Sequence, residues 1–184
     1  CVPRNMVQAA GMYNTLLEVN DRGIMIECLS AYRLKEKLPS NLLNYRVALG
    51  VPEIIKEGTD LTIVSYGATL RIAHEAAVLL DAMGISCEVI DVQTLLPFDI
   101  NSSILDSLKK PSRIIFADED LPGGAAAYMF NMVMEIQGGY RWLDVAPRTI
   151  TAQPHRPAYG TDGDYFSKPN VEDIINVVKE MMSE

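Results

Sequence analysis

The sequence predicts an α/β protein whose mostly parallel sheet is flanked by helices. Three observations lead to this fold class. Residues 60–99 form one complete strand–helix–strand unit, and strands joined through a helix run parallel to each other. Strands and helices then alternate to the end of the chain, as in sheets that are covered on both faces. With 48% hydrophobic and 22% charged residues among 184, the chain can bury a proper core.

The first unit is defined by glycines at both ends of its helix. Its opening strand is the apolar run 61–66, rich in β-branched residues, which Gly67 interrupts. Gly84 ends the helix, and residues 86–92 form the second strand. The apolar residues of the helix recur at three- and four-residue steps: Leu70, Ala73, Ala77 and Leu80. An apolar loop, 93–99, closes the unit.

The rest of the chain continues the alternation. A short helix is expected over 100–109, a strand over 113–117, and a helix from Gly124 until Gly138 and Gly139 end it. Residues 148–152 form a further strand. Asn170 can cap the last helix, which has a clean apolar stripe: Val171, Ile174, Ile175, Val178, Met181 and Met182.

The N-terminal part reads as the last repeat of an α/β domain whose beginning is missing. Asn5 is a plausible N-cap with Gln8 in the capping-box position. A helix follows, and then a short buried strand over 24–27. Residues 29–50 lack a regular pattern and read as an ordered connector, because a structureless loop of this length is uncommon inside one compact domain.

Charge and cysteine content exclude some function classes. The formal net charge of −8 disfavours binding to a phosphate backbone, so no nucleic acid partner is expected. Cys1, Cys28 and Cys87 form neither a CxxC pair nor an even disulfide set, which favours a reducing, cytoplasmic setting. No apolar run reaches the roughly 20 residues that a membrane span needs.

Candidate ligand-binding residues follow the strands, because ligands of open α/β sheets gather at the carboxyl ends of strands. These ends are residues 66–69, 93–97 and 118–120. The acids Asp118, Glu119 and Asp120 could bind a divalent metal. The favoured alternative is that they precede a helix, where negative charge is stabilising.

Neither histidine is predicted to be catalytic. His74 falls within the first helix and is read as structural. His155 lies in a loop without an activated nucleophile beside it, so a contact role is favoured over catalysis. A methionine-rich stretch, with Tyr128, Met129, Met132 and Met134, could form a soft binding surface, but core filling is favoured.

Several segments resemble one enzyme family. They are Val2-Pro3-Arg4-Asn5 and residues 27–36, 88–98, 118–124 and 155–160. Together they resemble the beta subunit, or the fused beta half, of the thiamine-diphosphate-dependent decarboxylating component of 2-oxoacid dehydrogenase complexes. The runs Tyr-Arg-Leu-Lys-Glu at 32–36 and His-Arg-Pro-Ala-Tyr-Gly at 155–160 lean toward the 2-oxoisovalerate, or branched-chain, type.

The resemblance implies a C-terminal fragment of such an enzyme. Residues 1–45 would be the tail of the pyrimidine-binding domain plus a connector, and 46–184 the transketolase C-terminal domain. The full enzyme would decarboxylate a 2-oxoacid with thiamine diphosphate and magnesium and acylate a lipoyl group. The family's activating glutamate, its catalytic histidine and its magnesium site lie outside the matched segments. We therefore expect no catalytic, cofactor-binding or metal-binding residue here, and no activity from the fragment alone.

The resemblance also implies partners. These are the alpha subunit or alpha half of the enzyme, the peripheral subunit-binding domain of the acyltransferase, and a further copy through the beta side. Many family members bind the subunit-binding domain through an aspartate before the last strand, and Asp144 matches that position. An aspartate beside a partner arginine forms a charge-assisted pair. The alternative is that Asp144 is an ordinary solvated turn residue.

Two other functions stay open. Within the enzyme class, the chain could come from a pyruvate-type dehydrogenase or from a transketolase-like enzyme, which shares the C-terminal fold. In another class, it could be a free-standing α/β module that binds a small ligand at pockets beside Gly67 and Gly123.

Overall fold

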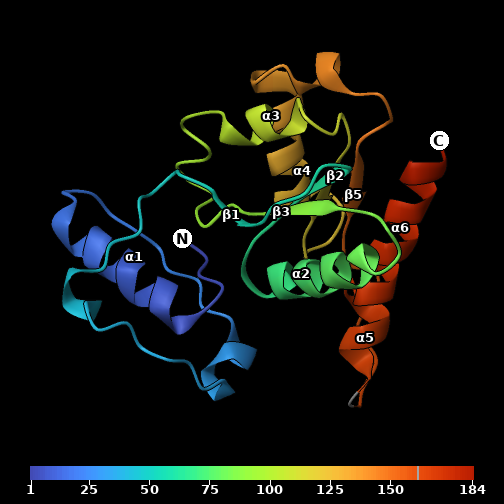
Figure 1. Ribbon diagram of the computed structural model, residues 1–184. Coiled ribbons are helices and arrows are strands. Elements are labelled where there is room, and N and C mark those ends of the chain that lie inside the picture. Colours follow the sequence, from blue (N-terminus) through green and yellow to red (C-terminus); the bar gives the residue numbers. More distant parts are fainter. Residues whose placement is uncertain (161) are drawn as a thin grey trace.

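The computed structural model describes residues 1–160 and 162–184, and this part of the chain forms a five-stranded sheet with helices on both faces (Figure 1). The strands follow the order β1-β3-β2-β4-β5 across the sheet. Their bounds are β1 Glu53–Lys56, β2 Leu61–Ser65, β3 Cys87–Asp91, β4 Ile114–Ala117 and β5 Arg148–Ile150. The predicted fold class, α/β with a mostly parallel sheet flanked by helices, is confirmed.

Three of the four strand pairings in the sheet are parallel, and the pairing at the β1 edge is antiparallel. β3 and β4 lie on either side of β2, and β5 extends the sheet beyond β4. β1 pairs with β3 in the antiparallel direction, with an irregularity between Ile54 and Lys56. β1 was not predicted from the sequence. Its residues are half-exposed or exposed, so they lack the continuous apolar run that identifies the buried strands.

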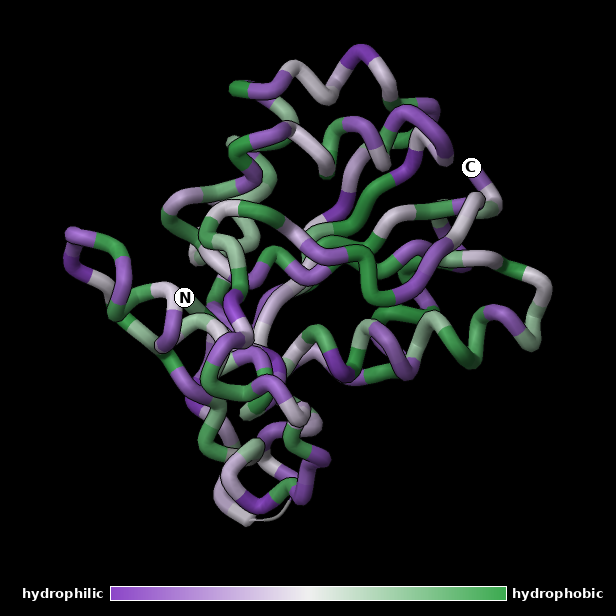
Figure 2. Tube along the Cα trace, turned by 60° about the vertical axis from the view of Figure 1, so that its left-hand side comes forward, coloured by the Kyte–Doolittle hydropathy of each residue, from purple (hydrophilic) through white to green (hydrophobic). Residues whose placement is uncertain are grey.

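Each face of the sheet has its own hydrophobic core. On one face lie α2 (Gly67–Asp81) and α6 (Val171–Ser183), and on the other lie α3 (Ser103–Leu108) and α4 (Ala125–Asn131) (Figure 1). Figure 2 shows continuous hydrophobic stretches along the central strands, whereas the helices alternate between hydrophobic and hydrophilic residues. The predicted cap of α6 is confirmed, because Asn170 and Asp173 form a complete capping box.

The helix after Gly124 departs from the prediction at its end. Met129 and Met134 are buried, which confirms that they fill the core. Residues Met132–Ile136 form a π-helical turn rather than a continuation of α4. A π turn adds a residue per turn and so rotates the apolar positions. As a result Ile136, expected on the same stripe, is 68% exposed.

The N-terminal part contains one helix, α1 (Met6–Glu18), and short 3₁₀ turns at Leu29–Arg33 and Leu42–Asn44. The Asn5 side chain caps α1 as predicted, by accepting from the Gln8 backbone N–H. The predicted buried strand over 24–27 is wrong. This segment is extended, but among the described residues its ladder is limited to two hydrogen bonds with Cys1, and Ile24 and Ile26 are 77% and 58% exposed.

A buried polar network fixes the N-terminal part on the edge of the sheet. Arg4 Nη1 lies 2.5 Å from Asp91 Oδ2 at the end of β3 and 2.7 Å from Glu53 Oε2 on β1. Gln8 Nε2 also donates to Asp91 Oδ2, over 2.9 Å, and to Gln93 Oε1. Burial raises the pKa of Asp91, although the hydrogen bonds from Gln8 and Arg4 oppose that rise. The network therefore joins residues far apart in the sequence at one point.

The buried thiol of Cys87 makes stability sensitive to alkaline pH. Burial raises the pKa of Cys87 to about 12 from 9.0, so the folded protein keeps this proton while the unfolded chain has lost it. The stabilisation is complete below pH 9 and is lost as pH rises toward 12. Between pH 8 and pH 10.5 we expect the free energy of unfolding to fall by about 2 kcal/mol through this residue.

Urea titrations at the two pH values measure this fall. The Cys87→Ala variant should lose about 2 kcal/mol less than the parent protein over that interval, whereas Cys1→Ala should behave like the parent. An equal fall in the parent protein and in Cys87→Ala would refute the assignment to this thiol.

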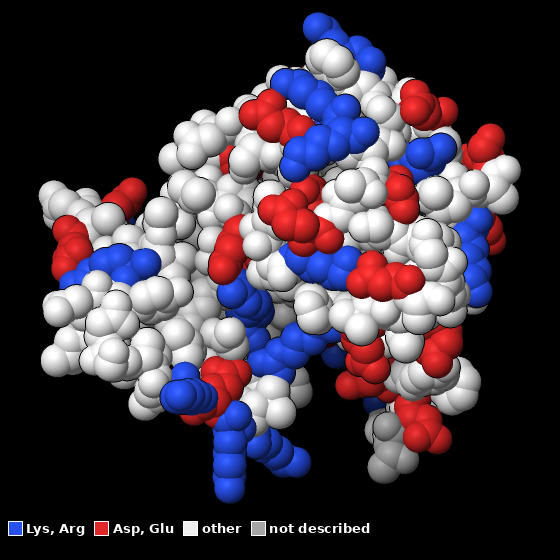
Figure 3. Space-filling model, viewed as in Figure 1, with Lys and Arg blue, Asp and Glu red and all other residues white. Residues whose placement is uncertain are grey.

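None of the helices in the described part of the chain has the length and hydropathy required to span a membrane. The charged groups of the face seen in Figure 3 are mixed in sign. Acidic side chains gather at its lower right, around α5 (Gly163–Ser167) and the neighbouring part of α6.

Candidate functional site

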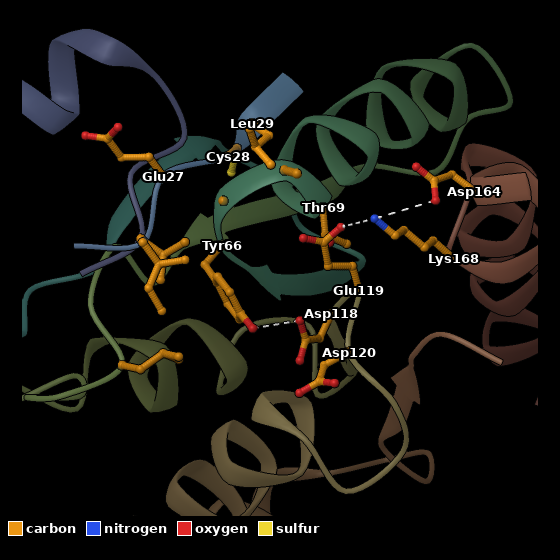
Figure 4. A pocket seen from close by; sticks show the side chains of 15 residues that line it. Glu27, Cys28, Leu29, Tyr66, Thr69, Asp118, Glu119, Asp120, Asp164 and Lys168 are labelled. Carbon is orange, nitrogen blue, oxygen red and sulfur yellow. Dashed lines mark hydrogen bonds and ion pairs between the residues drawn. The ribbon is translucent and has the colours of Figure 1, made fainter. Parts of the chain in front are cut away.

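A cleft with a volume of about 680 Å³ lies at the carboxyl ends of β2 and β4 (Figure 4). Residues 66–69 and 118–120, both expected to lie at this edge of the sheet, line it together with Leu95. The other walls come from Val2, residues 26–29, Asp164 and Lys168. Two of the three predicted strand ends are thus brought together, and the third contributes Leu95. Of the two glycines expected beside pockets, Gly67 lines the cleft and Gly123 does not.

The floor of the cleft is fixed by a hydrogen bond between the two strand ends. The Tyr66 hydroxyl donates to Asp118 Oδ1 over 2.7 Å, and the Ala126 backbone N–H donates to Asp118 Oδ2 over 3.2 Å. Asp118 is 1% exposed, so both partners compensate for its burial. Burial and the hydrogen bond to Asp118 raise the pKa of Tyr66. Asp118 therefore holds Tyr66 and the start of α4 in place.

The two neighbouring acids point toward different partners. Glu119 Oε2 lies 3.1 Å from Lys168 Nζ, and Asp164 Oδ1 lies 3.8 Å from the same nitrogen. Asp120 accepts from the Leu121 backbone N–H over 2.8 Å and is exposed. The described residues contain no group of three or more His, Cys, Asp or Glu side chains that could hold a metal ion. The divalent-metal alternative for residues 118–120 is therefore not supported by their geometry.

Glu27, which lines the cleft, is held by two tyrosines that were not singled out from the sequence. The Tyr13 hydroxyl donates to Glu27 Oε1 over 2.8 Å, and the Tyr32 hydroxyl donates to Oε2. These hydrogen bonds lower the pKa of Glu27. Its carboxylate points away from Tyr66 in Figure 4. Tyr13 and Tyr32 come from separate elements, so no local sequence pattern could have paired them.

The two histidines lie outside the cleft. His74 is exposed on α2, so it is a surface residue rather than a core residue. His155 is also exposed, and its Nδ1 lies 3.0 Å from the Arg156 carbonyl oxygen. Beside it, the Arg156 guanidinium stacks 4.9 Å from the centre of the Tyr159 ring. These contacts are local to the loop.

Asp144 is exposed in the turn before β5. Its backbone N–H donates to the Ser112 carbonyl oxygen over 3.0 Å, which fixes the turn. Trp142, two residues earlier, is 42% exposed, and the Lys109 ammonium lies 5.4 Å from its ring centre. A partner contact is predicted at Asp144 from the resemblance in sequence. Its position leaves the carboxylate accessible, and its role stays a prediction.

Comparison with known proteins gives matches over the whole chain. The model of the family "Transketolase, C-terminal domain" matches residues 50–170. The acetoin:2,6-dichlorophenolindophenol oxidoreductase subunit beta of Bacillus subtilis (strain 168) is 32% identical over 186 residues, which cover 100% of this chain and 52% of the relative. The pyruvate dehydrogenase E1 component subunit beta of the same organism is 30% identical over 183 residues, covering 98% and 54%.

Two further matches concern a branched-chain relative and the fold. The mitochondrial 2-oxoisovalerate dehydrogenase subunit beta of Dictyostelium discoideum is 32% identical over 137 residues, covering 73% of this chain and 36% of the relative. A solved structure described as "Split gene transketolase, inactive beta4 tetramer" superposes with a TM-score of 0.60 at 24% identity. The superposition covers 77% of this chain and 44% of that chain. This last likeness bears on the fold alone.

The chain spans about half the length of the two Bacillus relatives that it matches. It is a distant homologue, at about 30% identity, of beta subunits of the 2-oxoacid dehydrogenase family. Since the family model covers well over half of its residues, the chain belongs to the transketolase C-terminal domain family.

Proposed function

We propose that this chain is the C-terminal part of the decarboxylating component of a 2-oxoacid dehydrogenase complex, and that it serves subunit assembly and docking. The observation that carries the proposal is the match to beta subunits of two such dehydrogenases, the pyruvate type over 98% of this chain and the 2-oxoisovalerate type over 73% of it. The transketolase C-terminal fold of residues 50–170 supports it. The three free cysteines support a reducing compartment, the cytoplasm.

The cofactor chemistry is assigned to other parts of the whole protein and its alpha partner. Thiamine diphosphate supplies the decarboxylation chemistry in this family, with magnesium holding its diphosphate. The residues described here do not fit that group. Carboxylates outnumber ammonium groups in the cleft, which disfavours a diphosphate, and the described residues offer no cluster that could hold a metal ion. We therefore expect the chain alone to be inactive.

The assembly role rests on the exposed apolar residues of the N-terminal part. Several large hydrophobic side chains of residues 1–45 lie on the surface, among them Leu17, Ile24, Leu34, Leu38 and Leu43. Contiguous exposed apolar surface typically marks an interface. The proposed occupants are the alpha subunit, or the alpha half in a fused chain, and a second copy through the beta side.

The docking role is assigned to the turn that carries Asp144. Its exposed carboxylate can form a charge-assisted pair with an arginine of the acyltransferase's peripheral subunit-binding domain. The exposed Trp142 face offers an aromatic contact beside it. Because the Ser112–Asp144 hydrogen bond fixes the turn, little conformational entropy is lost on docking.

The substrate proposed is 2-oxoisovalerate, on the resemblance of residues 32–36 and 155–160 to the branched-chain type. The test is turnover by a longer protein that contains this chain, combined with its alpha partner, thiamine diphosphate and magnesium. With 2-oxoisovalerate, pyruvate and acetoin compared by kcat/KM, we expect 2-oxoisovalerate to be preferred by at least tenfold. A preference for pyruvate or acetoin would overturn the substrate proposal. No turnover of any of the three would overturn the enzyme class.

A further inference from the structure

The cleft lies where an open α/β sheet is expected to bind a ligand. β2 and β4 are parallel neighbours. β2 leads into α2 on one face and continues to β3 on one side, whereas β4 leads into α4 on the opposite face and continues to β5 on the other side. Helices that diverge to opposite faces leave a crevice between the carboxyl ends of the two strands. Tyr66 and Asp118 sit at these two ends and line the cleft.

The size and walls of the cleft suit a small organic molecule. Its volume of about 680 Å³ is within the roughly 300–1,000 Å³ range of ligand pockets. One part of the wall is apolar: Val2, Ile26, Leu29 and Leu95. The other part is acidic, with the four carboxylates of Asp118, Glu119, Asp120 and Asp164 against the single ammonium of Lys168. Glu27 also lines the cleft, but its carboxylate points away toward Tyr13 and Tyr32.

The partners of these charged groups leave the cleft negative. Lys168 lies between Glu119 and Asp164, at 3.1 and 3.8 Å, so its charge is already matched. The carboxylate of Asp120 accepts one backbone N–H and has no cationic partner among the described residues. In Figure 4 the carboxylates of Glu119 and Asp120 lie on the same side of the cleft as Asp118.

The pKa values of two neutral acids in the cleft, the Tyr66 hydroxyl and the Cys28 thiol, are raised by burial and, in addition, by this negative charge. Burial raises the pKa of the Tyr66 hydroxyl, and Asp118, Asp120 and Glu119 raise it further. Burial also raises the pKa of the Cys28 thiol, and Glu119 adds to that rise, against the opposing effects of Arg71 and the Ala68 backbone N–H.

The geometry points to this cleft as a binding site for a small organic cation, an ammonium or guanidinium group on a short aliphatic chain. The cationic group is held by Asp120 and Glu119, and the aliphatic chain packs against Leu29 and Leu95. A fully charged inorganic ion gains nothing from the apolar wall, and a neutral alkyl chain gains nothing from the carboxylates. The site is separate from the turn of Asp144 and does not depend on the proposed enzyme activity.

The test uses three probes of similar size and different charge. Binding of n-butylammonium, n-butanol and butyrate to the 184-residue chain is followed by ¹H–¹⁵N NMR at equal ionic strength. We expect n-butylammonium to give saturable shifts at the amides of Thr69, Glu119 and Asp120, with an affinity at least fivefold above n-butanol. Butyrate should give no saturable shifts there. Saturable binding of butyrate at the cleft, or equal affinity for n-butanol and n-butylammonium, would overturn the assignment.

A matched pair of variants tests the role of the acidic wall. Asp120→Asn keeps the shape and the hydrogen bond to Leu121, and should weaken n-butylammonium binding by about three- to tenfold. Asp106→Asn removes the same charge from an exposed position on α3, outside the cleft, and should leave the affinity unchanged. Equal weakening by both variants would show that net charge alone attracts the probe, which would contradict a site in the cleft.

Discussion

Asp91→Ala is expected to destabilise the protein by about 3 kcal/mol. The Asp91 side chain is fully buried and accepts from Arg4, from the Gln8 amide and, through Oδ1, from the Gln93 backbone N–H. Removing the carboxylate takes its acceptor from the Gln93 backbone N–H, and leaves Arg4 with the half-exposed Glu53 and the Gln8 amide with Gln93 Oε1. Unpaired buried donors and charges are among the costliest defects in a fold. Urea denaturation of the variant measures the loss.

Two companion variants make this prediction specific. Glu53 accepts from the same arginine but is 46% exposed, so Glu53→Ala should cost about 1 kcal/mol or less. The double variant Arg4→Met, Asp91→Leu should recover most of the loss, because an apolar pair of similar volume avoids the desolvation of two charges. The raised pKa of Asp91 points the same way, since burial outweighs the partners there. A double variant no more stable than Asp91→Ala would contradict this account of the network.

Phe116→Ala should cost about 3–5 kcal/mol of unfolding free energy. Phe116 is the largest fully buried side chain of the molecule's described part and lies on β4, the strand between β2 and β5. Its ring packs edge-on against Phe130 at 5.9 Å between centroids. Truncation removes both the apolar burial and this contact, and the surrounding α4 helix and strands cannot collapse into the cavity without losing their own packing.

A second phenylalanine provides the control. Phe166 has the same side chain but is 67% exposed on α5, so Phe166→Ala should change the free energy of unfolding by about 0.5 kcal/mol or less. Both values come from thermal or urea unfolding under identical conditions. Comparable losses at the two positions would refute the assignment of the core to the β4–α4 layer.

The elements predicted correctly from the sequence are those with a strong local signal. β2, β3 and β4 are continuous apolar runs, and α6 combines a complete capping box with a buried stripe. β1 was missed because its register is set by pairing with β3 rather than by its own pattern. The strand expected over 24–27 has the right composition, but the described residues give it only Cys1 to pair with. The β-strand propensity of a segment does not show whether a neighbouring strand is present to pair with it.

The candidate site was predicted in outline. The rule that ligands gather at the carboxyl ends of parallel strands brought residues 66–69 and 118–120 to the same edge, and both line the cleft. The place of Lys168 in the site depends on its ion pair with Glu119, 49 residues away along the chain. The orientation of Glu27 depends on its hydrogen bonds with Tyr13 and Tyr32. The Arg4–Asp91 pair spans 87 residues. Such contacts are set by the tertiary fold, and no spacing in a single sequence encodes them.

The central claim, that this chain docks the enzyme to its acyltransferase, is tested most directly by calorimetry. The 184-residue chain, in parent form and as Asp144→Ala, is titrated with the acyltransferase's peripheral subunit-binding domain. Glu75→Ala serves as a control that removes an exposed acid from α2, on the other face of the sheet. We expect salt-sensitive binding by the parent protein and by Glu75→Ala, weakened at least tenfold in Asp144→Ala. Equal binding by all three proteins would remove Asp144 as the anchor, and no binding by the parent protein would contradict the docking role itself.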